Sequence, residues 1–437
     1  MTTQHNAELI HRMGELVRAY CEHNHDFAFH PDRPVVRLHE PTFGADEIMA
    51  VVESLLSTQV TMGERVLAFE RQFAHSLRMT HGVMNNSGSS ANLLAIAALA
   101  NRETDNCLRP GDEVIVPALS WSTTVWPLIQ NGLVPVIVDI DPVTLNIDPE
   151  QIDRAVGPKT KAVMVVHVYG NPCDMTAIIQ RCQRYGLQLI EDCCEALGAE
   201  FDGRAVGSMG RVGTFSFYFS HHITTMEGGI CVTEDLGLAE MMRILRSHGW
   251  TRNLQHPERY TEKYPDIDPR FLFVNVGFNL RPTEPQAAMG AVQLPKLAGL
   301  VANRRRCAAQ LQASLAPFNE LFSCQQETVG GYHSWFGFPI VVNSTAPFSA
   351  AHLRRFLAQS GIETRPIICG NIAHQPGLQL YPHRLVGTLD CATHVMKNGL
   401  AIASHHAVDE GGVAYMVERI RAFLAQYSHS VTASSLP

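Results

Sequence analysis

Lysine is scarce in this sequence, and several larger features are missing as well. No apolar run approaches the roughly 20 residues that a membrane-spanning helix needs. The first twenty residues have helical spacing with acidic side chains and lack the apolar core of a signal peptide. The formal net charge of -8 argues against nucleic acid or an anionic membrane as the main partner, because both select basic patches. The only lysines are Lys159, Lys161, Lys263, Lys296 and Lys397.

Cysteine patterns typical of metal sites are also missing. The eleven cysteines are scattered, and neither Cys-x-Cys nor Cys-x-x-Cys occurs, with Cys193 and Cys194 the one adjacent pair. Zinc or iron-sulfur ligation is therefore not expected. Since the sequence shows no secretory signal, the thiols are expected to be reduced, which predicts a cytoplasmic protein.

What is present indicates a large globular enzyme. The chain is long enough for two or three domains, and its hydrophobic fraction of 46% is enough for a substantial core. Residues 1–37 predict a helical extension with a proline-spaced linker, expected to pack on the body or on a second subunit. Residues 38–300 predict a large domain and 301–428 a smaller C-terminal domain. The polar tail 429–437 is expected to be disordered.

Short apolar strands alternate with helices through the large domain. This order predicts an α/β fold with a mostly parallel, seven-stranded sheet that helices cover on both faces. Ligands of such sheets bind at the carboxyl ends of the strands. The C-terminal domain is expected to be a smaller α+β unit, with a long helix at 300–316. The seven strands are expected at 82–87, 113–119, 134–140, 161–170, 187–196, 215–219 and 229–233.

Two of these strand ends carry features of a binding site. At residues 85–94, NNSGSSANLL, a helix begins on small residues, and the backbone N-H groups of Gly88, Ser89 and Ser90 suit a phosphate. Serines also cap helices that bind nothing. At residues 117–126, PALSWSTTVW, Trp121 follows a strand and is a candidate to stack on a planar ring. A tryptophan packed in the core is the alternative.

A third strand ends in consecutive acids, in LIEDCCEALGA at residues 189–199. A carboxylate at this position needs a partner if it is buried. The protonated pyridine nitrogen of pyridoxal phosphate (PLP) would be such a partner for Asp192 and would keep the ring an electron sink. Metal ligation is the rival use of these acids, but no histidine cluster stands beside them in the sequence.

The fourth feature is GTFSFYFSHHITTMEGG at residues 213–229. Ser216 offers a hydroxyl to a phosphate, and His221 is expected beside the reactive carbon of the cofactor. An imidazole can move protons but cannot tether a cofactor aldehyde as a lysine amine does. None of the five lysines lies near a strand-end motif. Without the other three features, it would be equally reasonable to interpret the histidine pair as residues that only fill the surface or the core.

The four motifs in this order, together with GFNLRPTEPQAAMGAVQLPKL at residues 277–297, resemble the DegT/DnrJ/EryC1 family of PLP-fold sugar aminotransferases. The stretches FYFSHHITTMEGG, RSHGWTRNL, SWFGFPI and RPIICGN resemble its histidine-bearing sugar 3-dehydratase branch. The resemblance spans about residues 38–425. It implies a fold-type I homodimer with shared active sites, using PLP or its amine form, pyridoxamine phosphate (PMP).

The resemblance also implies roles for individual residues. Gly88, Ser89 and Ser216 would bind the cofactor phosphate, and Trp121 would stack on the ring. Asp192 would pair with the ring nitrogen, Glu195 would lie near the ring hydroxyl, and His221 would replace the lysine as catalytic base. Asn279 would reach the phosphate of the neighbouring subunit's cofactor. Apart from the resemblance, Arg252, Arg281 and Arg365 are candidates for substrate binding, because an arginine fork matches a carboxylate or a diphosphate, and a surface salt bridge is an equal alternative for each. Trp335 is a further candidate for substrate binding.

The expected reaction is removal of the 3-hydroxyl from a nucleotide-linked 4-keto-6-deoxyhexose, with L-glutamate regenerating PMP. A GDP-linked substrate is favoured, in dideoxysugar synthesis for lipopolysaccharide O-antigen. A related branch carries a [2Fe-2S] cluster on a cysteine-rich insert, but SHGWTRNLQHPERYTEKYPD has no cysteine, which excludes that cluster. Two alternatives stay open: a sugar aminotransferase that tolerates the histidine, and a catalytically silent homologue that binds a sugar nucleotide.

Overall fold

A central eight-stranded sheet organises the computed structural model, which describes residues 2–252, 254 and 256–427. The expected disordered tail lies outside the described residues. The strand order is β1-β9-β8-β5-β4-β2-β3-β13, and β9 alone runs antiparallel to its neighbours. The strands are β1 (His81–Asn85), β2 (Glu113–Pro117), β3 (Val134–Val138), β4 (Thr160–Val166), β5 (Gln188–Asp192), β8 (Val212–Ser216), β9 (Gly229–Thr233) and β13 (Arg384–Leu385).

The sheet confirms the predicted α/β fold and corrects its strand count. The first seven of these strands are those that the sequence predicts, while β13 is an eighth that comes from the C-terminal unit. It pairs with β3 in parallel, and the Arg384 guanidinium lies 2.7 Å from the Glu113 carboxylate. A strand of two residues is too short to show an alternating hydrophobic pattern, so the sequence alone did not predict β13.

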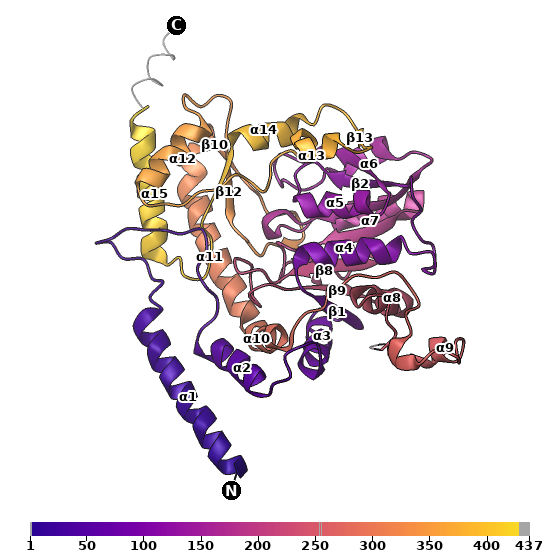
Figure 1. The fold of residues 1–437 in the computed structure, drawn as a ribbon. Helices are drawn as coiled ribbons and strands as arrows, with labels where there is room; N and C mark the ends of the chain where they lie inside the picture. The colour runs from indigo at the N-terminus through magenta and orange to yellow at the C-terminus, as the bar shows by residue number, and fades with distance from the viewer. Residues whose placement is uncertain (1, 253, 255, 428–437) are drawn as a thin grey trace.

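Helices cover both faces of the sheet, as Figure 1 shows. Helices α4, α5 and α8 pack on one face and α6 and α7 on the other, while α3 and α10 pack beside β1 and β8. Because both faces are buried, β2, β3 and β4 are nearly continuous apolar runs. These helices are α3 (Glu64–Ser76), α4 (Gly88–Leu99), α5 (Ser122–Gln130), α6 (Pro149–Ala155), α7 (Met175–Tyr185), α8 (Leu236–Arg246) and α10 (Glu284–Gln293).

A second core lies in the C-terminal unit, where helices pack on the antiparallel sheet β10-β12-β14. Helix α11 crosses residue 300, so one continuous helix joins the two predicted domains, whose boundaries stay a prediction. The elements here are β10 (Phe322–Cys324), β12 (Phe338–Val342), β14 (Gly399–Ile402), α11 (Leu297–Leu315), α12 (Ala350–Gln359), α13 (Pro376–Gln379), α14 (Asp390–Asn398) and α15 (Glu410–Ala425). A small third sheet joins β6 (Glu200–Phe201), β7 (Arg204–Ala205) and β11 (Gly331–Tyr332).

The N-terminal helix α1 (Thr2–Asn24) runs away from the body of the molecule and contacts α2 (Ala45–Leu56), as Figure 1 shows. On the opposite side, the short helix α9 (Glu258–Thr261) stands out at the end of a long segment after α8. Among the described helices, none combines the length and the apolar character that crossing a lipid bilayer requires.

Candidate active site

A cavity of about 330 Å³ opens at the carboxyl ends of the strands, the place that the fold predicts for a ligand. The loops that follow β1, β2, β5 and β8 form most of its wall, and the C-terminal unit closes it with Phe336 and Arg365. Eight of the predicted site residues line it: Gly88, Ser89, Trp121, Asp192, Glu195, Ser216, His221 and Arg365.

The start of helix α4 supplies free backbone donors to the cavity. Ser87 caps the helix by accepting a hydrogen bond of 3.1 Å from the Ser90 N-H, which removes Ser90 from the three predicted phosphate donors. In the described part of the chain, the Gly88 and Ser89 N-H groups have no acceptor. A side chain at residue 88 would place its Cβ 2.7 Å from Ser216 Oγ and even closer to Ser216 Cβ. Glycine is therefore required where these two motifs meet.

Asp192, at the end of β5, is buried and held by a polar network. Its Oδ2 accepts hydrogen bonds from Asn92 Nδ2 at 2.8 Å and Thr124 Oγ1 at 2.7 Å. The Cys194 N-H donates to Oδ1 at 3.1 Å, and Thr214 Oγ1 donates to Asn92 Oδ1 at 2.6 Å. Sequence reasoning missed Asn92 and Thr124. Asn92 did leave a signal, because it is the one polar residue in the apolar helical run ANLLAIAALA.

His221 lies in the cavity wall between two aromatic rings. Its ring meets Phe336 at 5.0 Å and Tyr218 at 6.1 Å between centroids, both edge to face. Burial lowers the pKa of His221 to about 4, so the imidazole is neutral at neutral pH. Its Nδ1 is buried without a hydrogen-bond partner among the described residues. None of the five lysines, all of which are described, lines this cavity.

The neighbouring His222 has a different environment. It is fully buried, and its Nε2-H donates to the Ser334 carbonyl at 3.0 Å. Burial lowers the pKa of His222 well below its usual value. In the His-His pair, the second histidine therefore packs in the interior and only the first faces the cavity.

Glu195 and Arg365 place opposite charges in the same wall. Burial raises the pKa of the Glu195 carboxyl, and the Arg365 guanidinium acts in the opposite direction. The Tyr169 N-H donates to Glu195 Oε2 at 2.9 Å, and Arg365 Nε donates to Tyr169 Oη at 3.1 Å. The guanidinium also lies over the Phe336 ring, 4.9 Å from its centroid. Arg365 is thus held firmly while its terminal nitrogens remain available for an anion.

The tryptophans predicted for the site lie in contrasting surroundings. Trp121 caps α5 at the cavity rim and is 55% exposed, so a face is free for a ring to stack on. Trp335 is only 3% exposed and stacks on His333 at 3.8 Å between centroids. It packs in the C-terminal core, and its neighbour Phe336 lines the cavity instead. The sequence SWF could not show which of the two aromatic residues faces inward.

Asn279, Arg252 and Arg281 do not line the cavity of their own chain. Arg281 Nε donates to Asn279 Oδ1 at 2.9 Å, and the Arg252 guanidinium lies 5.2 Å from the Trp250 ring centroid. Arg252 follows α8 and lines a separate pocket with Glu70, Arg71 and Arg243. The predicted role of Asn279 in a neighbouring subunit stays a prediction.

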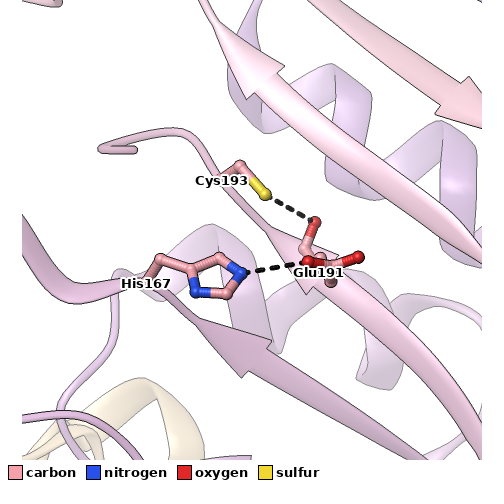
Figure 2. Close-up of side chains that lie close together, drawn as sticks. All are labelled: His167, Glu191 and Cys193. Carbon is pink, nitrogen blue, oxygen red and sulfur yellow. Dashed lines mark hydrogen bonds and ion pairs between the residues drawn. The ribbon is translucent and has the colours of Figure 1, made fainter. Parts of the chain in front are cut away.

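Figure 2 shows a cluster with metal-ligand chemistry, His167, Glu191 and Cys193, whose ligand atoms lie within 4.8 Å of one another. The sequence had suggested no histidine beside these acids, and the fold brings one there from the end of β4. Hydrogen bonds occupy the cluster. Glu191 accepts from His167 Nε2 and from three N-H groups of the loop 207–210, and His167 Nδ1 accepts from the Cys173 N-H. These contacts favour a structural role that ties the loop to β5.

The cavity fits PLP or PMP on three observations. Two unpaired N-H groups at the start of α4, with the Ser216 hydroxyl beside Gly88, suit a phosphate. The buried Asp192 carboxylate suits a protonated ring nitrogen. The neutral imidazole of His221 lines the same wall and can take up or give back a proton there.

Comparisons with known proteins agree with this geometry. Residues 41–421 match the model of the DegT/DnrJ/EryC1/StrS aminotransferase family. The chain is 41% identical over 378 residues to GDP-4-keto-6-deoxy-D-mannose 3-dehydratase of Yersinia pseudotuberculosis, covering 84% of this chain and 93% of the relative. The structure of the E. coli enzyme of that name with hydrated PLP superposes with a TM-score of 0.84 at 38% identity, covering 88% and 98% of the two chains. A GDP-4-keto-6-deoxymannose-3-dehydratase with a trapped PLP-glutamate geminal diamine gives a TM-score of 0.83 at 39% identity, covering 87% and 99%.

Proposed function

The chain belongs to the DegT/DnrJ/EryC1/StrS aminotransferase family, and from that premise we propose that it is a PLP/PMP-dependent 3-dehydratase of a nucleotide-linked 4-keto-6-deoxyhexose. The product is a 3,6-dideoxy-4-keto sugar. L-Glutamate regenerates the amine form of the cofactor and leaves as 2-oxoglutarate. The observation that carries the proposal is the neutral imidazole of His221 in a cavity that no lysine lines.

The residues around the cofactor divide the work. When bound, PMP supplies an amine for the sugar 4-keto group and a ring that accepts electrons. Gly88, Ser89 and Ser216 hold the phosphate, and Trp121 covers the ring. Asp192 pairs with the ring nitrogen, and the hydrogen bonds that its carboxylate accepts from Asn92 and Thr124 hold it in position. Glu195 lies near the ring hydroxyl.

His221 moves the proton. Because burial keeps its imidazole neutral, it can accept a proton from the cofactor methylene. The resulting imidazolium lies near the positive charge of Arg365. This repulsion lowers its pKa, so the imidazolium readily gives up its proton. The proton goes to the departing 3-hydroxyl, which leaves as water. With no lysine amine to intervene, water would hydrolyse the carbon-nitrogen bond at C4 of the released sugar, which restores the 4-keto group and releases the nitrogen as ammonia.

Arg365 is the anchor for the anionic amine donor. Its guanidinium is held by Tyr169 and Phe336 in the cavity wall, and a guanidinium fork matches a carboxylate. A GDP-linked sugar is the favoured substrate, because the relatives at 41% and 40% identity are named for one, whereas a 3-dehydratase of a dTDP-linked sugar matches at 34% identity.

We also propose a homodimer with shared active sites and a cytoplasmic location. The segment after α8 exposes Phe271 by 63% and Val276 by 91%, which a second copy would cover. It also carries Arg252, which lies outside its own cavity. A second copy would receive Asn279 and Arg252 at its site. The eleven unpaired cysteines suit a reducing compartment.

The experiment combines substrate screening with two variants. The protein is incubated with PLP, glutamate and GDP-, CDP- or TDP-linked 4-keto-6-deoxyhexoses, and 2-oxoglutarate, ammonia and the deoxygenated sugar are measured. His221→Lys should lose deoxygenation, and His222→Gln, which keeps a donor to the Ser334 carbonyl, should retain it. An amino sugar as the product would favour the aminotransferase alternative, and binding without turnover the silent homologue. Dehydration by His221→Lys at the parent rate would remove His221 from its role.

Subunit sharing has its own test. His221→Asn and Asn279→Ala are each expected to be inactive. Mixed and allowed to exchange subunits, they should regain roughly a quarter of parent activity, because half the dimers are mixed and each mixed dimer has one intact site. No recovery in a mixture shown to have exchanged would contradict shared sites.

A further inference from the structure

Residues 36–40 precede the range that matches the family model, yet the C-terminal unit holds them in place. Val36 forms a parallel bridge with Ile362: the Val36 N-H donates to the Gly361 carbonyl at 2.9 Å, and the Glu363 N-H donates to the Val36 carbonyl at 2.9 Å. The Leu38 N-H donates to Glu363 Oε2 at 3.0 Å. This linker is therefore a fitted part of the body.

A buried histidine and its half-buried neighbour hold the linker on either side of residue 39. His405 Nε2 donates to the Arg37 carbonyl at 3.0 Å, and His406 Nε2 donates to the Pro41 carbonyl at 3.1 Å. With both flanking carbonyls bonded, the backbone around His39 has little freedom to move.

The His39 side chain reaches a small cleft of about 10 Å³ that adjoins the active-site cavity. The two share Ser220, Phe336 and Arg365 as wall residues. The His39 ring packs edge to face on Phe219, 5.1 Å between centroids, which limits its rotation. A residue outside the family match thus lines a cleft that shares three wall residues with the catalytic cavity.

The cleft brings several hydrogen-bond donors together. Arg365 contributes its guanidinium, and the Tyr169 hydroxyl, which accepts from Arg365 Nε, still has its own proton to donate. Ser220 adds a hydroxyl and His39 an imidazole N-H. The volume suits one water-sized polar group. Donors of this kind around a cation favour an oxygen of a carboxylate.

The imidazole suits this task in its neutral form. Burial lowers the pKa of His39, and the Arg365 and Arg304 guanidinium groups act in the same direction, against Glu363 and Glu40. A neutral ring brings one N-H donor without adding a second buried cation beside Arg365.

We propose that His39 is a carboxylate-binding residue of the active site: its imidazole donates a hydrogen bond to the carboxylate of the amine donor that Arg365 anchors. The inference rests on the proposed function and deepens it by assigning part of the amine-donor site to the N-terminal linker. Through His39, the extension that precedes the family match contributes to selection of the donor.

The test separates the two substrates. His39→Ala should raise KM for glutamate about tenfold, the effect of losing a hydrogen bond to a charged group, and leave KM for the sugar nucleotide unchanged. His39→Gln keeps an N-H donor and should stay within about twofold of the parent. His352→Ala, at an exposed position of α12, is the control. In cofactor-free protein, titration calorimetry should show weaker binding of glutarate, an unreactive dicarboxylate, to His39→Ala than to His39→Gln.

The outcomes are distinct from those of the proposed function. If the parent forms no 2-oxoglutarate from glutamate, the proposed function fails. If the parent does so and His39→Ala keeps the parent KM for glutamate, the assignment of His39 is wrong. Equal rises in both KM values, or a rise for the sugar nucleotide alone, would also overturn it.

Discussion

Protonation of His406 should make acid destabilise this protein measurably. The imidazole holds the Pro41 carbonyl through Nε2, and its buried Nδ1 has no partner among the described residues. Burial lowers the pKa of His406 from 6.5 to about 4. As pH falls below 6.5, the unfolded chain takes up a proton that the folded chain refuses, so the unfolded state gains stability. The penalty grows down to about pH 4 and then levels off.

The magnitude follows from these two pKa values. Between pH 7.5 and pH 5, one such imidazole lowers the free energy of unfolding by about 2 kcal/mol. His406→Gln removes the titration and keeps an amide N-H for the Pro41 carbonyl. His405 is present in parent and variant, and the charge on His406 that would lower its pKa is mostly absent at pH 5, so the difference between the two proteins reports mainly on residue 406.

Urea unfolding at pH 7.5 and pH 5 measures the effect. The parent should lose about 2 kcal/mol more than His406→Gln over this interval. His352→Gln, at an exposed position, should follow the parent. Equal decreases in the free energy of unfolding for the parent and His406→Gln would refute the reasoning. The burial of this ring would then have no effect on the pH dependence of stability.

Three further predictions concern the site. Gly88→Ala would push a Cβ into Ser216, and this overpacking should lower the free energy of unfolding by about 1–3 kcal/mol. The same variant should bind PLP more weakly in an absorbance titration. The control Gly14→Ala meets no neighbour within 4 Å and should bind PLP as the parent does. Borohydride should fail to fix PLP covalently, as checked by mass spectrometry, since no lysine lines the cavity; a labelled lysine would contradict this. Glu191→Gln should lower the free energy of unfolding in urea by about 3 kcal/mol, because N-H groups of the loop 207–210 lose their acceptors. A chelator should leave the melting temperature of the parent unchanged. A lower melting temperature with the chelator would favour a metal at Glu191.

Much of the site could be predicted because its residues stand at strand ends. A strand with apolar residues at consecutive positions is buried on both faces of the sheet. The polar residue at its end then lies where the carboxyl ends of the parallel strands meet. Asp192 and Ser216 are the last residues of β5 and β8, and both line the cavity at this end of the strands. Parallel strands bring such ends together whatever their separation in the chain.

Residues that depend on packing between distant segments were harder to predict. Trp335 and Phe336 are adjacent and both apolar, and only the fold of the C-terminal unit turns Phe336 to the cavity. The cluster of His167 with Glu191 forms because β4 and β5 are neighbours in the sheet, although 24 residues separate the two side chains. No local pattern encodes either contact.

The sequence by itself determined the chemistry: a histidine at position 221, with lysine absent from every strand-end motif, allows proton transfer and excludes a lysine tether. It also determined the sheet, because local apolar periodicity specifies each strand. Only the tertiary structure decided which side chains share the cavity and that His39 lines a cleft with three of the same wall residues. The linker and Arg365 lie more than 300 residues apart, and hydrogen bonds such as that from Leu38 to Glu363 act only once both segments have folded.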